Sequence, residues 1–163
     1  MGRMTAQFLM SPKRDLSTAV DTLIAVGDDG ALLDGLAGLR DLVETLRNSP
    51  EDRFDVPIPI VNAAAVGAIA VRRSKPGVAR AAVDAMRATY SLGDLERDHA
   101  NEGDARLFEA FAGGLWALGA VACERRDWEL VATVIRVQPE QEFMEDLAKA
   151  FAATRRYFPP EGR

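Results

Sequence analysis

The chain has 163 residues, which is the length of one ordinary domain, and 48% of these residues are hydrophobic. The net charge is −5, with acidic and basic residues interspersed, which argues against a duplex-binding face because such a face needs clustered cations. A single cysteine excludes an internal disulfide and indicates a reducing compartment. We therefore expect one helical domain over residues 1–163, with a flexible N-terminus at 1–10 and a tail at 158–163.

Neither of the two longest uncharged runs, residues 56–71 and 110–123, reaches the roughly 20 residues that a membrane-spanning helix needs. Both runs are interpreted as buried helices. The first residues show no signal-peptide pattern, since the only apolar piece is the short "FLM". These observations predict a cytoplasmic protein that does not enter the membrane.

The first predicted helix begins at Ser11 and Pro12, with serine as the N-cap and proline at the first helical position. Gly27 ends this helix, and "GDDG" is a turn. A second, strongly amphipathic helix is predicted from Ala31 to about Arg47. The apolar stripe of that helix consists of Leu32, Leu36, Leu39, Val43 and Leu46.

Three prolines in "NSPEDRFDVPIP" end the second helix. Further helices are expected over residues 58–73, 76–90, 104–125 and 128–137, with a polar linker near 91–104. A last helix begins at Pro139, with Phe143, Leu147 and Phe151 facing inward. No segment alternates like a half-buried strand. The predicted fold class is all-α, with about seven helices in three antiparallel hairpins that turn near Gly27, Ser74 and Arg126.

Two of the predicted helices resemble each other. The segment "AVGAIAVRR" at residues 65–73 aligns with "ALGAVACER" at 117–125, and Gly67 falls on Gly119. A glycine inside a helix costs about 0.5–1 kcal/mol relative to alanine, so its presence in both segments needs a reason. Close approach of a neighbouring helix supplies one.

One segment resembles the core pattern of a tetratricopeptide repeat. The matching residues are Leu118, Gly119, Ala122, Asp127, Trp128 and Val131. Gly67, Ala70 and Ala79 match part of the same pattern. The resemblance implies stacked antiparallel helix pairs that bind proteins or peptides on a concave face. The turns near residues 27, 74 and 126 are 47 and 52 residues apart, whereas true repeats are about 34 residues long. An α-solenoid-like array and a compact helical bundle therefore both stay open.

Residues with reactive side chains do not form a catalytic pattern in this sequence. His99 lies among alternating acids, but His99 and Ala105 stand where a calcium loop needs glycine and glutamate. Cys123 lies within an apolar helix and is interpreted as a structural thiol, and Trp116 and Trp128 as core residues. We accordingly predict no catalytic residues, no metal site and no cofactor.

Four arginines are the candidate partner-binding residues. Arg72 and Arg73 precede the second turn, Arg125 and Arg126 lie at the third, and Lys75 is close by. Stacked hairpins would place them along one basic ridge suited to a carboxylate-rich partner. Cations at helix C-termini are also favourable through the helix dipole alone, by about 0.3–1 kcal/mol.

These observations favour a non-enzymatic protein-interaction or regulatory module that binds a protein or peptide, alone or within a larger assembly. The alternatives are a regulator responsive to a small ligand or a nucleic acid, and an enzyme with a pocket between helices.

Overall fold

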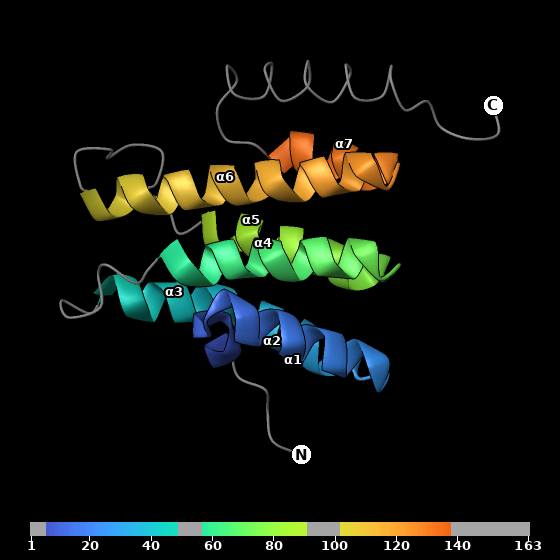
Figure 1. Cartoon of the computed structure of the whole chain (residues 1–163). Helices are drawn as coiled ribbons and strands as arrows, with labels where there is room; N and C mark the ends of the chain where they lie inside the picture. Colours follow the sequence, from blue (N-terminus) through green and yellow to red (C-terminus); the bar gives the residue numbers. More distant parts are fainter. Residues whose placement is uncertain (1–5, 49–56, 91–101, 138–163) are drawn as a thin grey trace.

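The computed structural model describes residues 6–48, 57–90 and 102–137, and every element in these ranges is helical (Figure 1). No strand occurs in the described ranges, so the predicted all-α class is confirmed. The elements are η1 (Ala6–Met10), α1 (Lys13–Ala25), α2 (Asp29–Ala37), α3 (Leu39–Asn48), α4 (Pro57–Arg72), α5 (Pro76–Tyr90), α6 (Glu102–Glu124) and α7 (Trp128–Val137).

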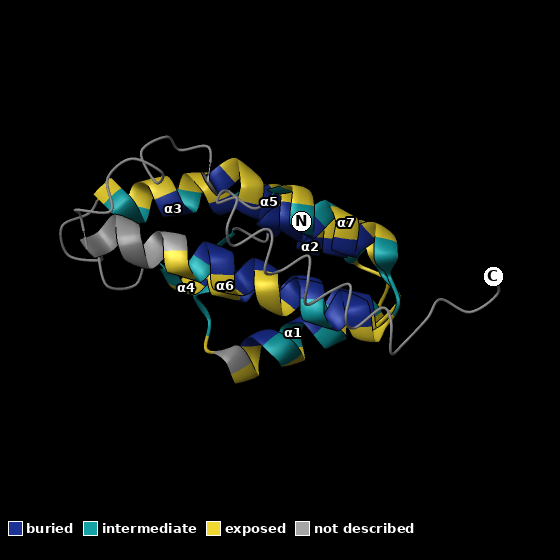
Figure 2. Cartoon of the chain, turned by 90° about the horizontal axis from the view of Figure 1, so that it is seen from above, coloured by how far each residue is buried: buried dark blue, intermediate teal, exposed yellow. Residues whose placement is uncertain are grey.

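The helices lie in two layers. One layer contains α1, α4 and α6 with α4 in the middle, and the other contains α2, α5 and α7 with α5 in the middle (Figures 1 and 2). The pairs α1–α2, α4–α5 and α6–α7 are the three predicted antiparallel hairpins. Each hairpin contributes its first helix to one layer and its second helix to the other, so α1, α4 and α6 run in the same direction.

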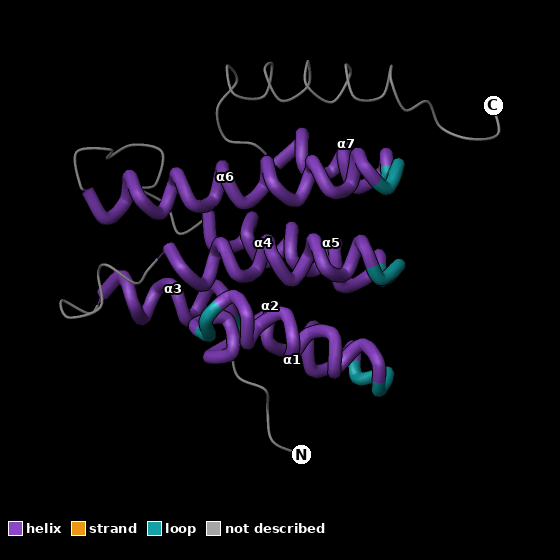
Figure 3. Tube along the Cα trace, viewed as in Figure 1, coloured by secondary structure: helices purple, strands orange, loops and turns teal. Residues whose placement is uncertain are grey.

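The three hairpin turns lie at one end of the molecule and share one hydrogen-bond pattern (Figure 3). In each turn a backbone N–H donates to the carbonyl five residues earlier, and the residue before it has a positive φ. This is the Schellman geometry, which satisfies the last carbonyls of a helix. The donor–acceptor pairs are Asp28–Leu23, Lys75–Ala70 and Asp127–Ala122, at 2.9, 2.8 and 2.9 Å, and the positive-φ residues are Gly27, Ser74 and Arg126.

The helix predicted as continuous from Ala31 to about Arg47 is instead two helices, α2 and α3, which meet at Gly38. The cause is η1, which packs against this break. A Cβ on Gly38 would lie 3.1 Å from the Cβ of Ala6, and one on Gly35 would overlap the ring of Phe8. The predicted apolar stripe nevertheless faces the core, with Leu32, Leu36, Leu39 and Val43 buried.

The start of α1 differs from its prediction. Ser11 is not the N-cap of α1, because Pro12 occupies that position with extended backbone and no side chain caps the helix. The Ser11 carbonyl instead accepts a hydrogen bond from the Nδ2 of Asn62 at 3.0 Å. Residues 6–10 form η1, and Leu9 is completely buried.

The core is centred on α4, which packs against α1, α5 and α6. A Cβ on Gly67 would lie 3.0 Å from the Cβ of Ala82 on α5 and 3.1 Å from the Cδ1 of Leu118 on α6. The prediction that Gly67 is a helix-contact position is therefore confirmed. Gly119 is buried in α6.

Of the two tryptophans predicted to lie in the core, Trp128 packs against it, but Trp116 is 39% exposed, so that prediction is wrong for Trp116. Several expectations fall outside the described residues: the linker residues through 101 with His99, the last helix from Pro139, and the tail at 158–163. Among the described helices, none combines the length and the apolarity that a membrane crossing requires.

Candidate functional site

The central helix α4 has no polar face. Its sequence, PIPIVNAAAVGAIAVR, is apolar nearly all round, a pattern that normally indicates burial on every side. One stripe of α4 nevertheless faces outward: Ile58 is 38% exposed and Val61 48% exposed, and the stripe continues through the partly exposed Ala65, Ala68 and Ile69 to Arg72. A continuous apolar stripe of this kind is typical of an interaction surface.

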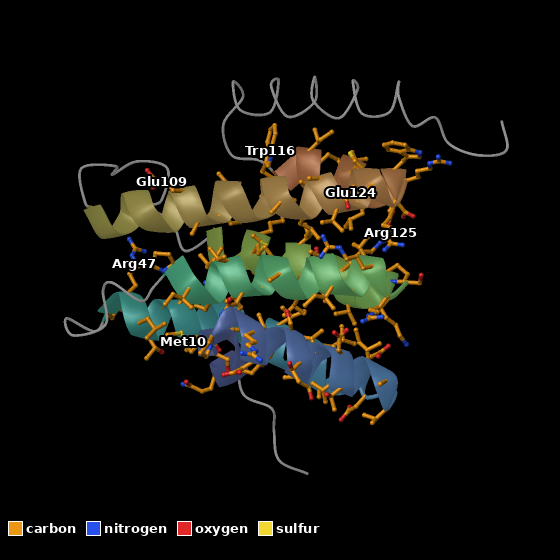
Figure 4. The ribbon with its side chains drawn as sticks, in the orientation of Figure 1. Met10, Arg47, Glu109, Trp116, Glu124 and Arg125 are labelled. Atoms are coloured by element: carbon orange, nitrogen blue, oxygen red, sulfur yellow. The ribbon has the colours of Figure 1, made fainter. Side chains whose placement is uncertain are left out.

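From Val61 to Arg72, this stripe is the floor of a groove whose walls are α1 and α6. The groove has a volume of about 380 Å³. Ser17 contributes the α1 wall, and α6 contributes mainly small residues, including Ala110, Gly113 and Ala117. Short side chains on both α4 and α6 keep the groove open. Glu109 lies at one end of the groove on α6, and Arg125, which follows α6, lines a second hollow beyond the other end (Figure 4).

Three of the four predicted arginines meet at one end of the groove. Arg72, Arg73 and Arg125 line a second hollow of about 410 Å³, which shares Ser17, Ile69 and Arg72 with the groove. The two hollows are therefore adjacent. Arg126 is not among the residues that line either hollow; it occupies the positive-φ position of the α6–α7 turn.

The cations at this end differ in their partners. Arg73 donates from Nε to Oδ1 of Asp21 on α1 at 2.9 Å, and Lys75 pairs with Asp29 at 3.1 Å. Within the described part of the chain, no ion-pair partner reaches Arg72 or Arg125, and both are exposed. Uncompensated positive charge at the groove end therefore comes from Arg72 and Arg125, whereas Arg73 links α4 to α1.

The opposite half of the groove presents oxygen acceptors. Asn62 is 5% exposed and lines the groove. Its Nδ2 donates to the carbonyls of Leu9 and Ser11, so the amide nitrogen must face η1. No donor from the described residues reaches its Oδ1, which is left as an acceptor. The carboxylate of Glu109, an exposed residue of α6, adds negative charge at this end.

Cys123 is buried in α6, as predicted. Burial raises the pKa of its thiol to about 11, so the side chain is protonated near neutral pH and is a poor nucleophile. Among the described residues, no group of three or more His, Cys, Asp or Glu side chains is arranged to hold a metal ion.

The positions of the arginines in the sequence indicate a candidate binding site, but no sequence pattern indicates the groove. The apolar run at residues 56–71 predicts a buried helix, because an apolar sequence gives no sign that one face of the helix lacks a neighbour. The one sequence feature that could have indicated the groove is the missing polar face of α4. Nothing in the local sequence around Ser17, Asn62 or Glu109 indicates that these residues line a groove.

The chain matches no protein-family model, and comparison with curated proteins and with solved structures gave no match.

Proposed function

We propose that this chain is a non-enzymatic docking module that binds a segment of a partner protein in the groove over α4. The observation that carries the proposal is the exposed apolar stripe of α4. Burying a valine or isoleucine side chain contributes about 1.5–3 kcal/mol, and Ile58 and Val61 leave part of that contribution unused. A partner lying between α1 and α6 would cover Val61, which lines the groove.

The arginine end of the groove suits an acidic group of that partner. Arg72 and Arg125 approach the same hollow, and guanidinium groups form directional hydrogen bonds with carboxylates. The helix dipole accounts for arginines at these helix ends as well, by about 0.3–1 kcal/mol each. The dipole gives no reason, however, for the two side chains to border a shared hollow. Arg73 and Arg126 have structural positions, so the proposed partner-binding pair is Arg72 and Arg125.

The resemblance to tetratricopeptide repeats supports the same function. Such arrays of stacked hairpins bind proteins or peptides on a concave face. Here the first helices α1, α4 and α6 line the groove. The three turns with one hydrogen-bond pattern are also what stacked hairpins would have.

A pair of tryptophan substitutions tests the proposal. Ala117 is exposed on α6 and lines the groove, whereas Ala132 is exposed on α7 in the other layer. Peptides selected from a random display library on the native chain should lose at least about tenfold in affinity for Ala117→Trp, because the indole fills the groove. Ala132→Trp is the matched control and should bind like the parent. Selected peptides that bind all three proteins equally would contradict the proposal.

A further inference from the structure

We propose that the occupant of the groove is an α-helix of the partner, antiparallel to α4, with acidic residues in its first turn and cationic residues in its last. This inference rests on the proposed docking function and specifies the class of partner.

The apolar lining of the groove favours a helix over an extended segment. An extended peptide presents an N–H and a C=O at every residue, and each needs a partner when buried. Between the charged ends of the groove, Ser17 and Asn62 are the only polar residues that line it in the described part of the chain. A helix satisfies its backbone groups internally and needs no such partners. The small side chains of Ala65, Ala68 and Gly113 would let a helix backbone come close.

The groove and the neighbouring arginine-lined hollow together set the length of the helix. Glu109, at one end of the groove, and Arg125, which follows α6 and lines the second hollow, are 16 residues apart in the sequence. At 1.5 Å per residue this separation is about 24 Å, which a helix of about 16 residues would span. An extended strand would cover the same distance with about seven residues. The number of residues in the bound segment therefore distinguishes a helical partner from an extended one.

The charges at the two ends set the direction. Arg72 and Arg125 attract acidic side chains, and acidic residues are most favourable in the first turn of a helix. Glu109 and the Oδ1 of Asn62 are acceptors, and cationic donors are most favourable in the last turn. The C-termini of α1, α4 and α6 all lie at the arginine end. A helix that begins there is antiparallel to all three, which also aligns the helix dipoles favourably.

A display library of 16-residue peptides tests the direction directly. The first and last turns are randomised among Glu, Gln and Lys, and the middle among Ala, Gly, Ser, Leu and Pro. Peptides are selected for binding to the full chain, and those that also bind the Ala117→Trp variant are removed. Sequences with acidic first turns and basic last turns should be enriched about tenfold over the reverse order, the sum of two or three exposed ion pairs. Equal enrichment of both orders, or enrichment of proline in the middle, would overturn the inference.

A charge-inverted protein is the control. The triple variant Arg72→Glu, Arg125→Glu and Glu109→Lys changes only exposed side chains, and its thermal melting checks that it folds. It should select the opposite charge order. Selection of the same order by both proteins would show that these charges do not orient the occupant. If peptides bind the parent but not Ala117→Trp and show no preferred charge order, the inferred helix direction is wrong but the docking function stands. If no peptide distinguishes the parent from Ala117→Trp, both the inferred helix and the proposed docking function are wrong.

Discussion

At the scale of single residues, glycines decide how closely the helices approach. Gly67 has neighbours on two helices, whereas a Cβ on Gly113 would have nothing within 4 Å. Both are helical, and Gly113 lies on the exposed side of α6. The sequence pattern pointed to Gly67, because its match with Gly119 lies in a conspicuous run of small residues. It could not rank the glycines, because their neighbours come from other helices.

Opposite effects on stability are expected from these two positions. Gly67→Val should lower the free energy of unfolding by about 1–3 kcal/mol, since the added atoms overlap Ala82 and Leu118. Gly113→Ala should raise it by about 0.5–1 kcal/mol, because alanine restricts the unfolded chain and meets no neighbour. Urea unfolding monitored by circular dichroism measures both. A Gly67→Val protein as stable as the parent would show that the α4 contacts are looser than described.

The thiol of Cys123 couples stability to pH. Its pKa is raised from 9.0 to about 11 by burial, so the folded state holds the proton more tightly than the unfolded state. This contribution is complete below pH 9 and is lost as pH rises through 11. The parent should lose about 2 kcal/mol relative to Cys123→Ala between about pH 8 and pH 10.5. Urea unfolding of both proteins at each pH tests this; a difference that stays constant with pH would contradict it.

At the scale of elements, the sequence predicts the helical hairpins better than it predicts the interruption between α2 and α3. The bounds of α7 were predicted correctly, because an acidic N-cap and a clear apolar period define that helix locally; Asp127 Oδ1 accepts from the N–H of Leu130 at 3.1 Å. The break at Gly38 depends on η1, which packs there from a distant part of the sequence. Local periodicity contains no information about such a contact, so α2 and α3 were predicted as one helix.

The residue with a positive φ in each hairpin turn leads to a prediction about backbone strain. Ser74 has a φ of 57° and Gly27 a φ of 75°, in turns with the same hydrogen bonds. A residue with a Cβ in this region costs about 1–2 kcal/mol, and glycine avoids most of that cost. Ser74→Gly should therefore raise the melting temperature, and the reciprocal Gly27→Ser should lower it. A Cβ on Gly27 would meet nothing within 4 Å, so φ alone accounts for the effect. Parallel shifts of both variants would contradict this explanation.

At the scale of the whole molecule, the proposed binding surface arises from how the hairpins stack. The sequence predicted which residues are apolar and which helices pair. It did not predict that α1 and α6 would leave one stripe of α4 uncovered, because that depends on how three hairpins separated in sequence pack together. The arginines were identified from their positions at helix ends, but only the packing distinguishes Arg73, which pairs with Asp21, from Arg72 and Arg125.

This distinction leads to a prediction about salt. Reversing Arg72 and Arg125 to Glu should lower the free energy of unfolding by about 1–2 kcal/mol, because each helix end loses a favourable dipole interaction while no ion pair among the described residues is broken. Binding of an acid-containing peptide selected on the groove should weaken at least about tenfold at low salt. That loss should shrink when salt is raised from about 50 to 500 mM, since screening removes the attraction in the parent.

Arg73→Glu is the matched control for this pair. The substitution places an acid beside Asp21 on α1, so a modest destabilisation is expected without a comparable, salt-dependent loss of binding. Fluorescence anisotropy over a salt series measures binding, and urea unfolding measures stability. If all three substitutions weaken binding equally, the groove end acts through its overall charge rather than through Arg72 and Arg125. If none does, the acidic part of the partner lies elsewhere, and the apolar stripe of α4 alone must hold the bound segment.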